Sequence, residues 1–326
     1  MDRKDLKIVF FGTPEFAVES LDRLVNDGYT ISAVVTMPDK IAGRGHKLIE
    51  SDVKKYAKEK GLPIMQPPKL KDPVFLEDLR NLGADLFVVI AFRMLPKQVW
   101  EMPRLGTFNL HAALLPKYRG AAPINHAVMN GESVTGVTTF FINEEIDTGE
   151  IIAQKEIEIL PEENAGDVHD KLMHLGAEMT ALTVADLLEG KVTTYPQPDG
   201  EFIPAPKIFK EDCLIRWEND CEKIHNFVRG LAPYPAAWTR LTMEDGKETD
   251  IKIYQTHPAP ELGNTDCAPG TVTTIGNKMY AATGDKWLQI LSLMPAGKRR
   301  MDASAFLLGY KHVKVQCTTL TIRKIR

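Results

Sequence analysis

The sequence predicts an α/β protein with two domains, a mostly parallel sheet domain followed by a smaller β-barrel. Three observations lead to this fold class. The chain has 326 residues, about twice the ~150 residues expected of a single domain. Its N-terminal part alternates short apolar runs with helical patterns, which is typical of βαβ units. A proline-rich stretch then leads into short apolar runs separated by Gly and Pro.

The predicted N-terminal domain begins with a buried strand at residues 7–11 and a helix at 14–25. Thr13 is expected to cap this helix, with Pro14 at its first position, and Ser51 is expected to cap a second helix. Parallel strands with crossover helices place ligands beyond their carboxyl ends. The further predicted elements are strands at 31–36, 86–91, 107–111, 134–142 and 150–159 and helices at 51–60, 96–100 and 166–188.

The C-terminal part begins after a linker that contains Pro196, Pro198, Pro204 and Pro206. Proline lacks an amide hydrogen, so this stretch is neither a regular helix nor a central strand. One helix is predicted beyond it, and short strands that need closure to remove their edges favour a small barrel. The predicted domains are 1–189 and 207–326, joined by a linker at 190–206, with the helix at 221–231 and strands at 250–255 and 286–291 among others.

Charge is distributed unevenly along the chain. Residues 207–326 hold 18 Lys and Arg against 13 Asp and Glu, a net charge of +5, and residues 1–206 hold 22 against 31, a net charge of −9. A basic domain is compatible with an RNA partner, although a solvated surface explains the same charge. Residues 43–47 combine two glycines with three basic side chains. The composition of this segment predicts either a loop that binds along the phosphate backbone of a nucleic acid or a solvated loop.

Cysteine usage and hydropathy place limits on the class of protein. Cys213, Cys221, Cys267 and Cys317 lack Cys-x-x-Cys spacing, which favours reduced thiols over a disulfide framework or a zinc site. No histidine pair has the spacing of a metal site. There is no apolar run long enough to span a bilayer and no cleavable leader. We therefore expect a cytoplasmic protein without a membrane or metal partner.

The main chemical signal is a strand that ends in Asn109 and His111, followed by a Pro/Gly loop and by Asp147 in an Asp-Thr-Gly turn. Side chains two apart on a strand point to the same face. An amide can donate to an oxygen that gains charge, and an imidazole can move a proton. Asp147 is expected to hold the ring. A charged His111 would stabilise the oxyanion and a neutral one would act as a base, and the sequence leaves both open.

Each of these features also has a purely structural interpretation. A polar strand end and an Asp-Thr-Gly turn are common without any catalytic role. Gly12-Thr-Pro lacks the glycine spacing of dinucleotide and Walker A motifs, so we interpret it as a strand-to-helix turn. The sequence alone therefore supports metal-free acyl or formyl transfer only as a hypothesis.

Several motifs resemble the methionyl-tRNA formyltransferases, a family within the folate-dependent formyltransferases. They include Gly12-Thr-Pro-Glu-Phe, the block from Asn109 to Pro123, Asp147-Thr-Gly149 and Pro295-Ala-Gly-Lys298, and the similarity spans essentially the whole chain. The resemblance implies a Rossmann-like formyltransferase domain and an OB-like C-terminal barrel that helps to hold tRNA. It implies formyl transfer from 10-formyltetrahydrofolate to the amino group of methionyl initiator tRNA.

The resemblance also assigns residues by motif. Asn109, His111 and Asp147 would be catalytic, and Arg44, His46 and Lys47 would contact tRNA. The residues expected to line the folate pocket are Ile90, Phe92, Met94, Leu95, Ala113, Leu114, Leu115, Pro116, Phe140 and Ile142.

Two departures from the family pattern concern the folate pocket. Ala113 stands where the family usually has Ser, so a hydroxyl contact is lost. Residues 91–96 read Ala-Phe-Arg-Met-Leu-Pro, one residue shorter than the usual Ala-Tyr-Gly-x-x-Leu-Pro. Both departures fall on segments that the resemblance places at the folate, and neither touches the catalytic trio.

Three rival functions remain open at this stage. They are a formyltransferase for a small amine, such as glycinamide ribonucleotide or an amino sugar nucleotide, a noncatalytic tRNA-binding protein, and a folate hydrolase. We expect a monomer.

Overall fold

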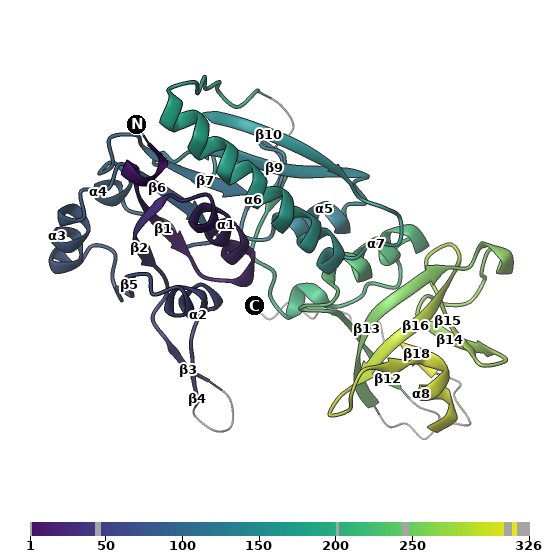
Figure 1. Ribbon diagram of the computed structural model, residues 1–326. Coiled ribbons are helices and arrows are strands. Elements are labelled where there is room, and N and C mark those ends of the chain that lie inside the picture. Colours follow the sequence, from purple (N-terminus) through teal and green to yellow (C-terminus); the bar gives the residue numbers. More distant parts are fainter. Residues whose placement is uncertain (1, 43–46, 200–201, 243–247, 310–314, 318–326) are drawn as a thin grey trace, which may run out of the picture. The chain divides into compact units, whose positions relative to one another are not determined.

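The computed structural model describes residues 2–42, 47–199, 202–242, 248–309 and 315–317. The chain divides into two compact units (Figure 1). Unit 1 comprises residues 1–123, 134–158 and 169–206, and unit 2 comprises residues 124–133, 159–168 and 207–326. Two short segments of the N-terminal half are thus grouped with the C-terminal unit. The contiguous boundaries expected from sequence stay a proposal.

Unit 1 is built on a seven-stranded sheet in the order β10-β9-β7-β6-β1-β2-β5. The five strands from β7 to β5 are parallel, and β9 and β10 are antiparallel to their neighbours. The mostly parallel sheet predicted from sequence is therefore confirmed. The strands are β1 (Lys7–Gly12), β2 (Thr30–Val35), β5 (Ile64–Met65), β6 (Leu86–Ile90), β7 (Thr107–His111), β9 (Val134–Phe141) and β10 (Ile151–Glu158).

Helices cover both faces of this sheet. On one face, α6 packs against α1 through Phe16 and His169, whose ring centroids are 5.3 Å apart, and reaches β9 through the Thr183–Thr139 hydrogen bond of 3.0 Å. On the other, Phe75 of α3 and Val99 of α4 join a buried cluster with side chains of β1 and β6. The helices of unit 1 are α1 (Glu15–Asn26), α2 (Asp52–Glu59), α3 (Pro73–Asn81), α4 (Lys97–Trp100) and most of α6 (Ala165–Glu189).

The ends of these helices test the expected caps. Ser51 caps α2 as predicted, because its Oγ accepts from Lys54 N at 3.1 Å. The prediction for Thr13 is wrong. Pro14 occupies the N-cap position of α1 in an extended conformation, and no side chain caps this helix. Thr13 lies one residue too early, and its Oγ1 is buried without a hydrogen-bond partner among the described residues.

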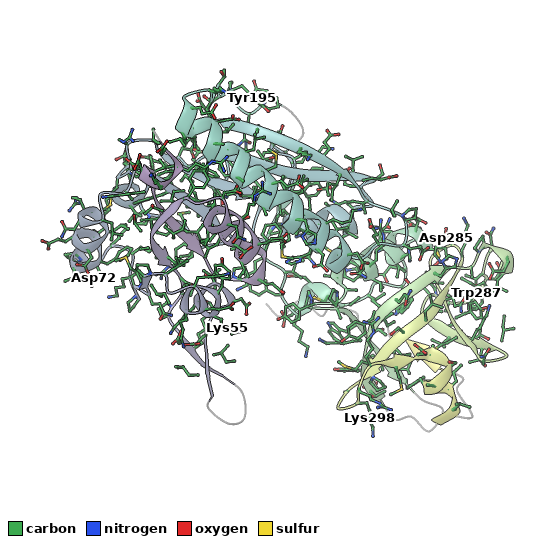
Figure 2. The ribbon with its side chains drawn as sticks, in the orientation of Figure 1. Lys55, Asp72, Tyr195, Asp285, Trp287 and Lys298 are labelled. Atoms are coloured by element: carbon green, nitrogen blue, oxygen red, sulfur yellow. The ribbon has the colours of Figure 1, made fainter. Side chains whose placement is uncertain are left out.

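The segment after α6 packs on unit 1 rather than running free. Tyr195, labelled in Figure 2, forms an antiparallel bridge with Ile151 at the start of β10. Further on, β11 (Pro204–Ala205) pairs in parallel with β8 (Arg119–Gly120). The predicted linker thus supplies backbone hydrogen bonds to the loop that follows β7.

Unit 2 contains an antiparallel sheet in the order β13-β12-β18-β14-β15-β16-β17. Because β13 also pairs with β16, six strands close into a ring, which confirms the predicted barrel. Trp217 is fully buried in its core and donates to Thr239 Oγ1 at 3.0 Å. The elements are α5 (Pro123–Met129, most of it), α7 (Cys221–Leu231), β12 (Ala237–Thr242), β13 (Glu248–Pro258), β14 (Thr271–Ile275), β15 (Lys278–Ala282), β16 (Trp287–Pro295), β17 (Met301–Asp302), α8 (Ala303–Gly309) and β18 (Val315–Cys317).

Two smaller features complete the fold. A hairpin of β3 (Lys40–Ala42) and β4 (Lys47–Ile49) extends from unit 1 near α2 (Figure 1). Among the helices that the structure describes, none is both long and apolar enough to cross a bilayer.

Candidate active site

Asn109 and His111 lie at the carboxyl end of β7, between β6 and β9. This edge is where an open α/β sheet binds its ligands. Asn109 is half-buried and lies beside Val89 and Phe140 on the neighbouring strands. Within the described part of the chain, no residue forms a hydrogen bond with the Asn109 carboxamide. Its amide is therefore available to a ligand at this edge.

The His111 ring is buried, with 6% of its side chain exposed. Its Nε2 lies 2.9 Å from the backbone carbonyl oxygen of Tyr118. A carbonyl oxygen can only accept a hydrogen bond, so Nε2 carries a proton. The other nitrogen, Nδ1, faces Asp147 Oδ2 at 3.8 Å. The ring is therefore oriented by the hydrogen bond that it donates to the Tyr118 carbonyl, and the Asp147 carboxylate lies at ion-pair distance from Nδ1.

Asp147 is held in place by the loop after β7. Its Oδ2 accepts from Gly120 N at 2.9 Å, and its backbone has a positive φ of 56°. Two residues later, a Cβ on Gly149 would lie 1.6 Å from the carbonyl oxygen of Phe141. Only glycine fits there, which explains the last residue of the Asp-Thr-Gly turn. The structure thus brings His111 and Asp147 together from segments distant in sequence.

Backbone strain gathers at this edge of the sheet. Ala91, Tyr118 and Asp147 have φ values of 48°, 61° and 56°, in the left-handed region that side chains other than glycine rarely adopt. Ala91 directly follows β6, and the other two supply partners of His111. Strained residues of this kind cluster where a site must be held in a fixed shape.

Several polar side chains that sequence analysis did not single out brace these loops. Thr138 Oγ1 donates to the carbonyl oxygen of Ala113 at 2.7 Å and accepts from Leu115 N at 3.1 Å. Gln197 and Arg119 join the loop after β7 to the Asp147 turn. No local pattern marks these residues, because their partners lie far away along the chain.

The residues expected to line the folate pocket differ widely in exposure. Met94 is 65% exposed, whereas Ile90 and Ala113 are completely buried. Leu115 and Phe140 form a small buried cluster with Ile151. Half-buried positions are the ones that can present a side chain to a ligand at this edge. These half-buried residues are Phe92, Leu114, Pro116 and Ile142. Leu95, in contrast, is buried in the core beside α4.

The basic segment predicted to contact tRNA falls on the β3–β4 hairpin. Arg44 and His46 lie outside the described residues, and the backbone of Lys47 begins β4. Next to it, Leu48 and Ile49 expose 61% and 53% of their surface. Across the ranges that the structure describes, no group of three or more His, Cys, Asp or Glu side chains could hold a metal ion.

Two family models match successive parts of the chain. The family "Formyl transferase" matches residues 6–184, and "Formyl transferase, C-terminal domain" matches residues 207–311. A methionyl-tRNA formyltransferase of Bacteroides fragilis is 51% identical over 315 residues, covering 95% of this chain and 97% of the relative. One from Parabacteroides distasonis is 53% identical over 321 residues, covering 96% and 98%.

Solved structures at lower identity share the fold. HypX from Aquifex aeolicus aligns with a TM-score of 0.63 at 18% identity, covering 94% of this chain and 47% of that one. The sugar 3N-formyltransferase WlaRD aligns with a TM-score of 0.62 at 19% identity, covering 90% and 99%. Since the close sequence relatives cover nearly the full length, the chain belongs to the formyl transferase family and, within it, to the methionyl-tRNA formyltransferases.

Proposed function

We propose that this chain transfers the formyl group of 10-formyltetrahydrofolate to the amino group of methionyl initiator tRNA, and that Asn109, His111 and Asp147 carry out the chemistry. The main support is the pairing of a free carboxamide with a histidine whose Nδ1 faces a carboxylate. Both side chains lie at the carboxyl edge of β7, where a ligand can reach them.

Asn109 stabilises the oxyanion that develops on the formyl oxygen. Its amide is a neutral donor, so no charge has to be desolvated. Within the described part of the chain it has no hydrogen-bond partner, so binding the substrate breaks no existing bond there. A donor already aimed at the developing charge contributes roughly 10²–10³ in kcat.

The amine attacks the formyl carbon and His111 accepts its proton at Nδ1; the bond from the formyl carbon to N10 then breaks, and the proton passes to N10 as tetrahydrofolate leaves. The Nε2 proton of His111 is engaged by the Tyr118 carbonyl, so the neutral ring has its lone pair on Nδ1. The imidazolium that forms is stabilised by Asp147 at 3.8 Å. This assignment favours the base role among the two that the sequence left open.

The substrates are held by parts of the chain outside the trio. The half-buried residues Phe92, Leu114, Pro116 and Ile142 line the folate pocket, and a solved relative of the same fold, HypX, is described in complex with tetrahydrofolic acid. The segment 43–47 and the domain at 207–326 contact the tRNA. A translation substrate implies a cytoplasmic location, and a monomer stays our prediction.

Incubation with label in the formyl group of the donor tests this function. Charged initiator tRNA, glycinamide ribonucleotide, an amino sugar nucleotide and no acceptor form the four arms. Label on the methionyl amine of the tRNA is the expected result. Label on a small amine, label released as formate without acceptor, or salt-dependent tRNA binding without transfer would each replace the proposal with one of its rivals.

A further inference from the structure

One carboxamide from the segment after α6 makes four hydrogen bonds at the active site. Gln197 Nε2 donates to the backbone carbonyl oxygens of Asp147 and Gly149 at 2.8 and 3.0 Å. Gln197 Oε1 accepts from Nε and Nη2 of Arg119 at 3.1 and 2.5 Å. Gln197 therefore joins the Asp-Thr-Gly turn to the loop that follows β7.

The orientation of this carboxamide is determined by its partners. A guanidinium can only donate and a backbone carbonyl can only accept. The oxygen of Gln197 must therefore face Arg119, and its NH₂ group must face Asp147 and Gly149. No other neutral side chain of this size satisfies both sides at once.

The two segments that Gln197 joins are the ones that hold His111 and Asp147. The carbonyl of Tyr118 fixes the His111 ring and the amide of Gly120 binds the Asp147 carboxylate. Arg119 lies between Tyr118 and Gly120 in the sequence. Its guanidinium also lies 5.6 Å from the ring centroid of Phe202. Movement of Arg119 relative to Asp147 would therefore change the separation of His111 Nδ1 from the carboxylate.

We infer that Gln197 is a positioning residue for the formyl transfer reaction. It acts through the backbone of Asp147 and through Arg119, and it keeps the His111–Asp147 pair at its working distance. This inference rests on the proposed function. It also adds a role to the segment after α6, which already pairs with β10 through Tyr195 and with β8 through β11.

Two substitutions separate positioning from simple packing. Gln197→Glu keeps the shape and the contact with Arg119 but sets a carboxylate oxygen against two carbonyl oxygens. Gln197→Met keeps the approximate size and removes all four hydrogen bonds. Thr194→Val, in the same segment as Gln197, is the matched control, because within the described ranges Thr194 Oγ1 donates only to the exposed Glu150 carboxylate, at 2.5 Å.

Steady-state kinetics with the full chain, charged initiator tRNA and 10-formyltetrahydrofolate give the readout, together with melting temperature. We expect both Gln197 variants to lower kcat per folded molecule roughly 10- to 100-fold with KM for both substrates unchanged, because small displacements at a reacting centre are costly. The pH profile of kcat should also shift, since the environment of His111 changes. Thr194→Val should keep the wild-type kcat and pH profile.

A lower melting temperature with wild-type kcat and pH profile would show a structural role and overturn the inference. The same follows if Thr194→Val loses as much activity as Gln197→Met. Should Gln197→Glu fail to fold, Gln197→Met decides. An inactive wild-type chain would instead refute the proposed function, so the two failures are distinguishable.

Discussion

His111 has one ring nitrogen bound by the chain and one left for chemistry. The sequence suggested that Asp147 would orient the ring, but His111 Nε2 donates its hydrogen bond, at 2.9 Å, to the Tyr118 carbonyl. Tyr118 is seven residues further on in a strained turn with φ of 61°, and no local pattern links it to His111. The motif thus pointed to the ring, and under the proposed function the loop conformation leaves Nδ1 as the nitrogen that takes the proton.

Asn109→Ala should lower kcat by roughly 10²–10³ with little effect on folding, because the lost amide is a donor to the developing oxyanion. Single-turnover formylation measures this, with circular dichroism to check the fold. Asn26→Ala removes an exposed carboxamide that binds Asp22 on α1 and should leave kcat unchanged. Wild-type turnover of Asn109→Ala would refute the role of this side chain.

Asp147→Asn tests charge separately from position. Its Oδ atom can still accept from Gly120 N, which now binds the carboxylate at 2.9 Å, but it no longer stabilises an imidazolium. We expect kcat to fall at least about 10²-fold while KM for the folate is unchanged. If Asp147→Asn is as active as wild type and Asp147→Ala is not, the carboxylate serves only to hold the loop.

The elements of the fold followed mostly from local pattern. Strand β7 and helix α7 begin and end at the predicted residues, because apolar periodicity and flanking turn residues agree at both. Helix α3 was not predicted, although Asp72 followed by Pro73 marks its start: Asp72 Oδ1 accepts from Val74 N at 2.9 Å. The pairing of β8 with β11 had no local signal, since two-residue strands depend on their partner.

Helix α7 carries a buried histidine that couples unit 2 to pH. His225 Nδ1 lies 3.0 Å from Thr256 Oγ1 on β13. Burial lowers the pKa of His225 below its usual 6.5, the Arg229 charge lowers it further, and Glu162 and Glu222 partly oppose them. The ring is therefore neutral in the folded state over a wider pH range than in the unfolded chain.

The stability of unit 2 should depend on pH through the proton that His225 takes up on unfolding. Above about pH 6.5 the ring is neutral in both states and contributes no pH dependence, and below it the unfolded chain takes up a proton that the folded one does not. The free energy of unfolding should therefore fall as the pH drops from about 6.5 toward the lowered pKa. For one proton, the limiting slope of the free energy of unfolding against pH is about 1.4 kcal/mol per pH unit.

The measurement compares urea unfolding of wild type and His225→Asn at about pH 7.5 and about pH 5.5. Tryptophan fluorescence reports on unit 2, which holds three of the four tryptophans. The variant should lose part of the pH dependence. His257→Asn, with an exposed ring on β13 paired to Glu162 at 3.2 Å, should retain it. Equal pH dependence in wild type and His225→Asn would contradict the prediction.

At the scale of the whole molecule, the distribution of charge along the chain bears on how a large polyanion such as tRNA can bind. The C-terminal domain has a net charge of +5 and the rest of the chain has −9. The basic segment 43–47 is thus a local exception within an acidic part of the sequence. Phosphate contacts from such a loop and from the basic domain depend strongly on salt.

Arg44→Ala should raise KM for charged tRNA and flatten its salt dependence by about one phosphate contact, while KM for the folate stays unchanged. The measurement is kcat/KM for charged tRNA over a series of salt concentrations. Arg23→Ala, which removes an exposed cation paired with Asp27 on unit 1, is the control and should leave the slope unchanged. An unaltered slope for Arg44→Ala would exclude the loop as an RNA contact.

The sequence by itself determined the α/β fold class with its second, barrel-like part, the longer strands of the N-terminal sheet and most of its helices, and the catalytic trio as a hypothesis. These features depend on local periodicity and on short motifs, which the neighbours of each residue largely decide. Only the tertiary structure revealed the Tyr118 carbonyl on His111, the missing cap at Thr13 and the contacts of Gln197. The contacts of Tyr118 and Gln197 depend on where distant backbone groups meet, which is a consequence of packing and has no signature in the local sequence. The cap at Thr13 is missing because the folded chain places Pro14 at the N-cap position.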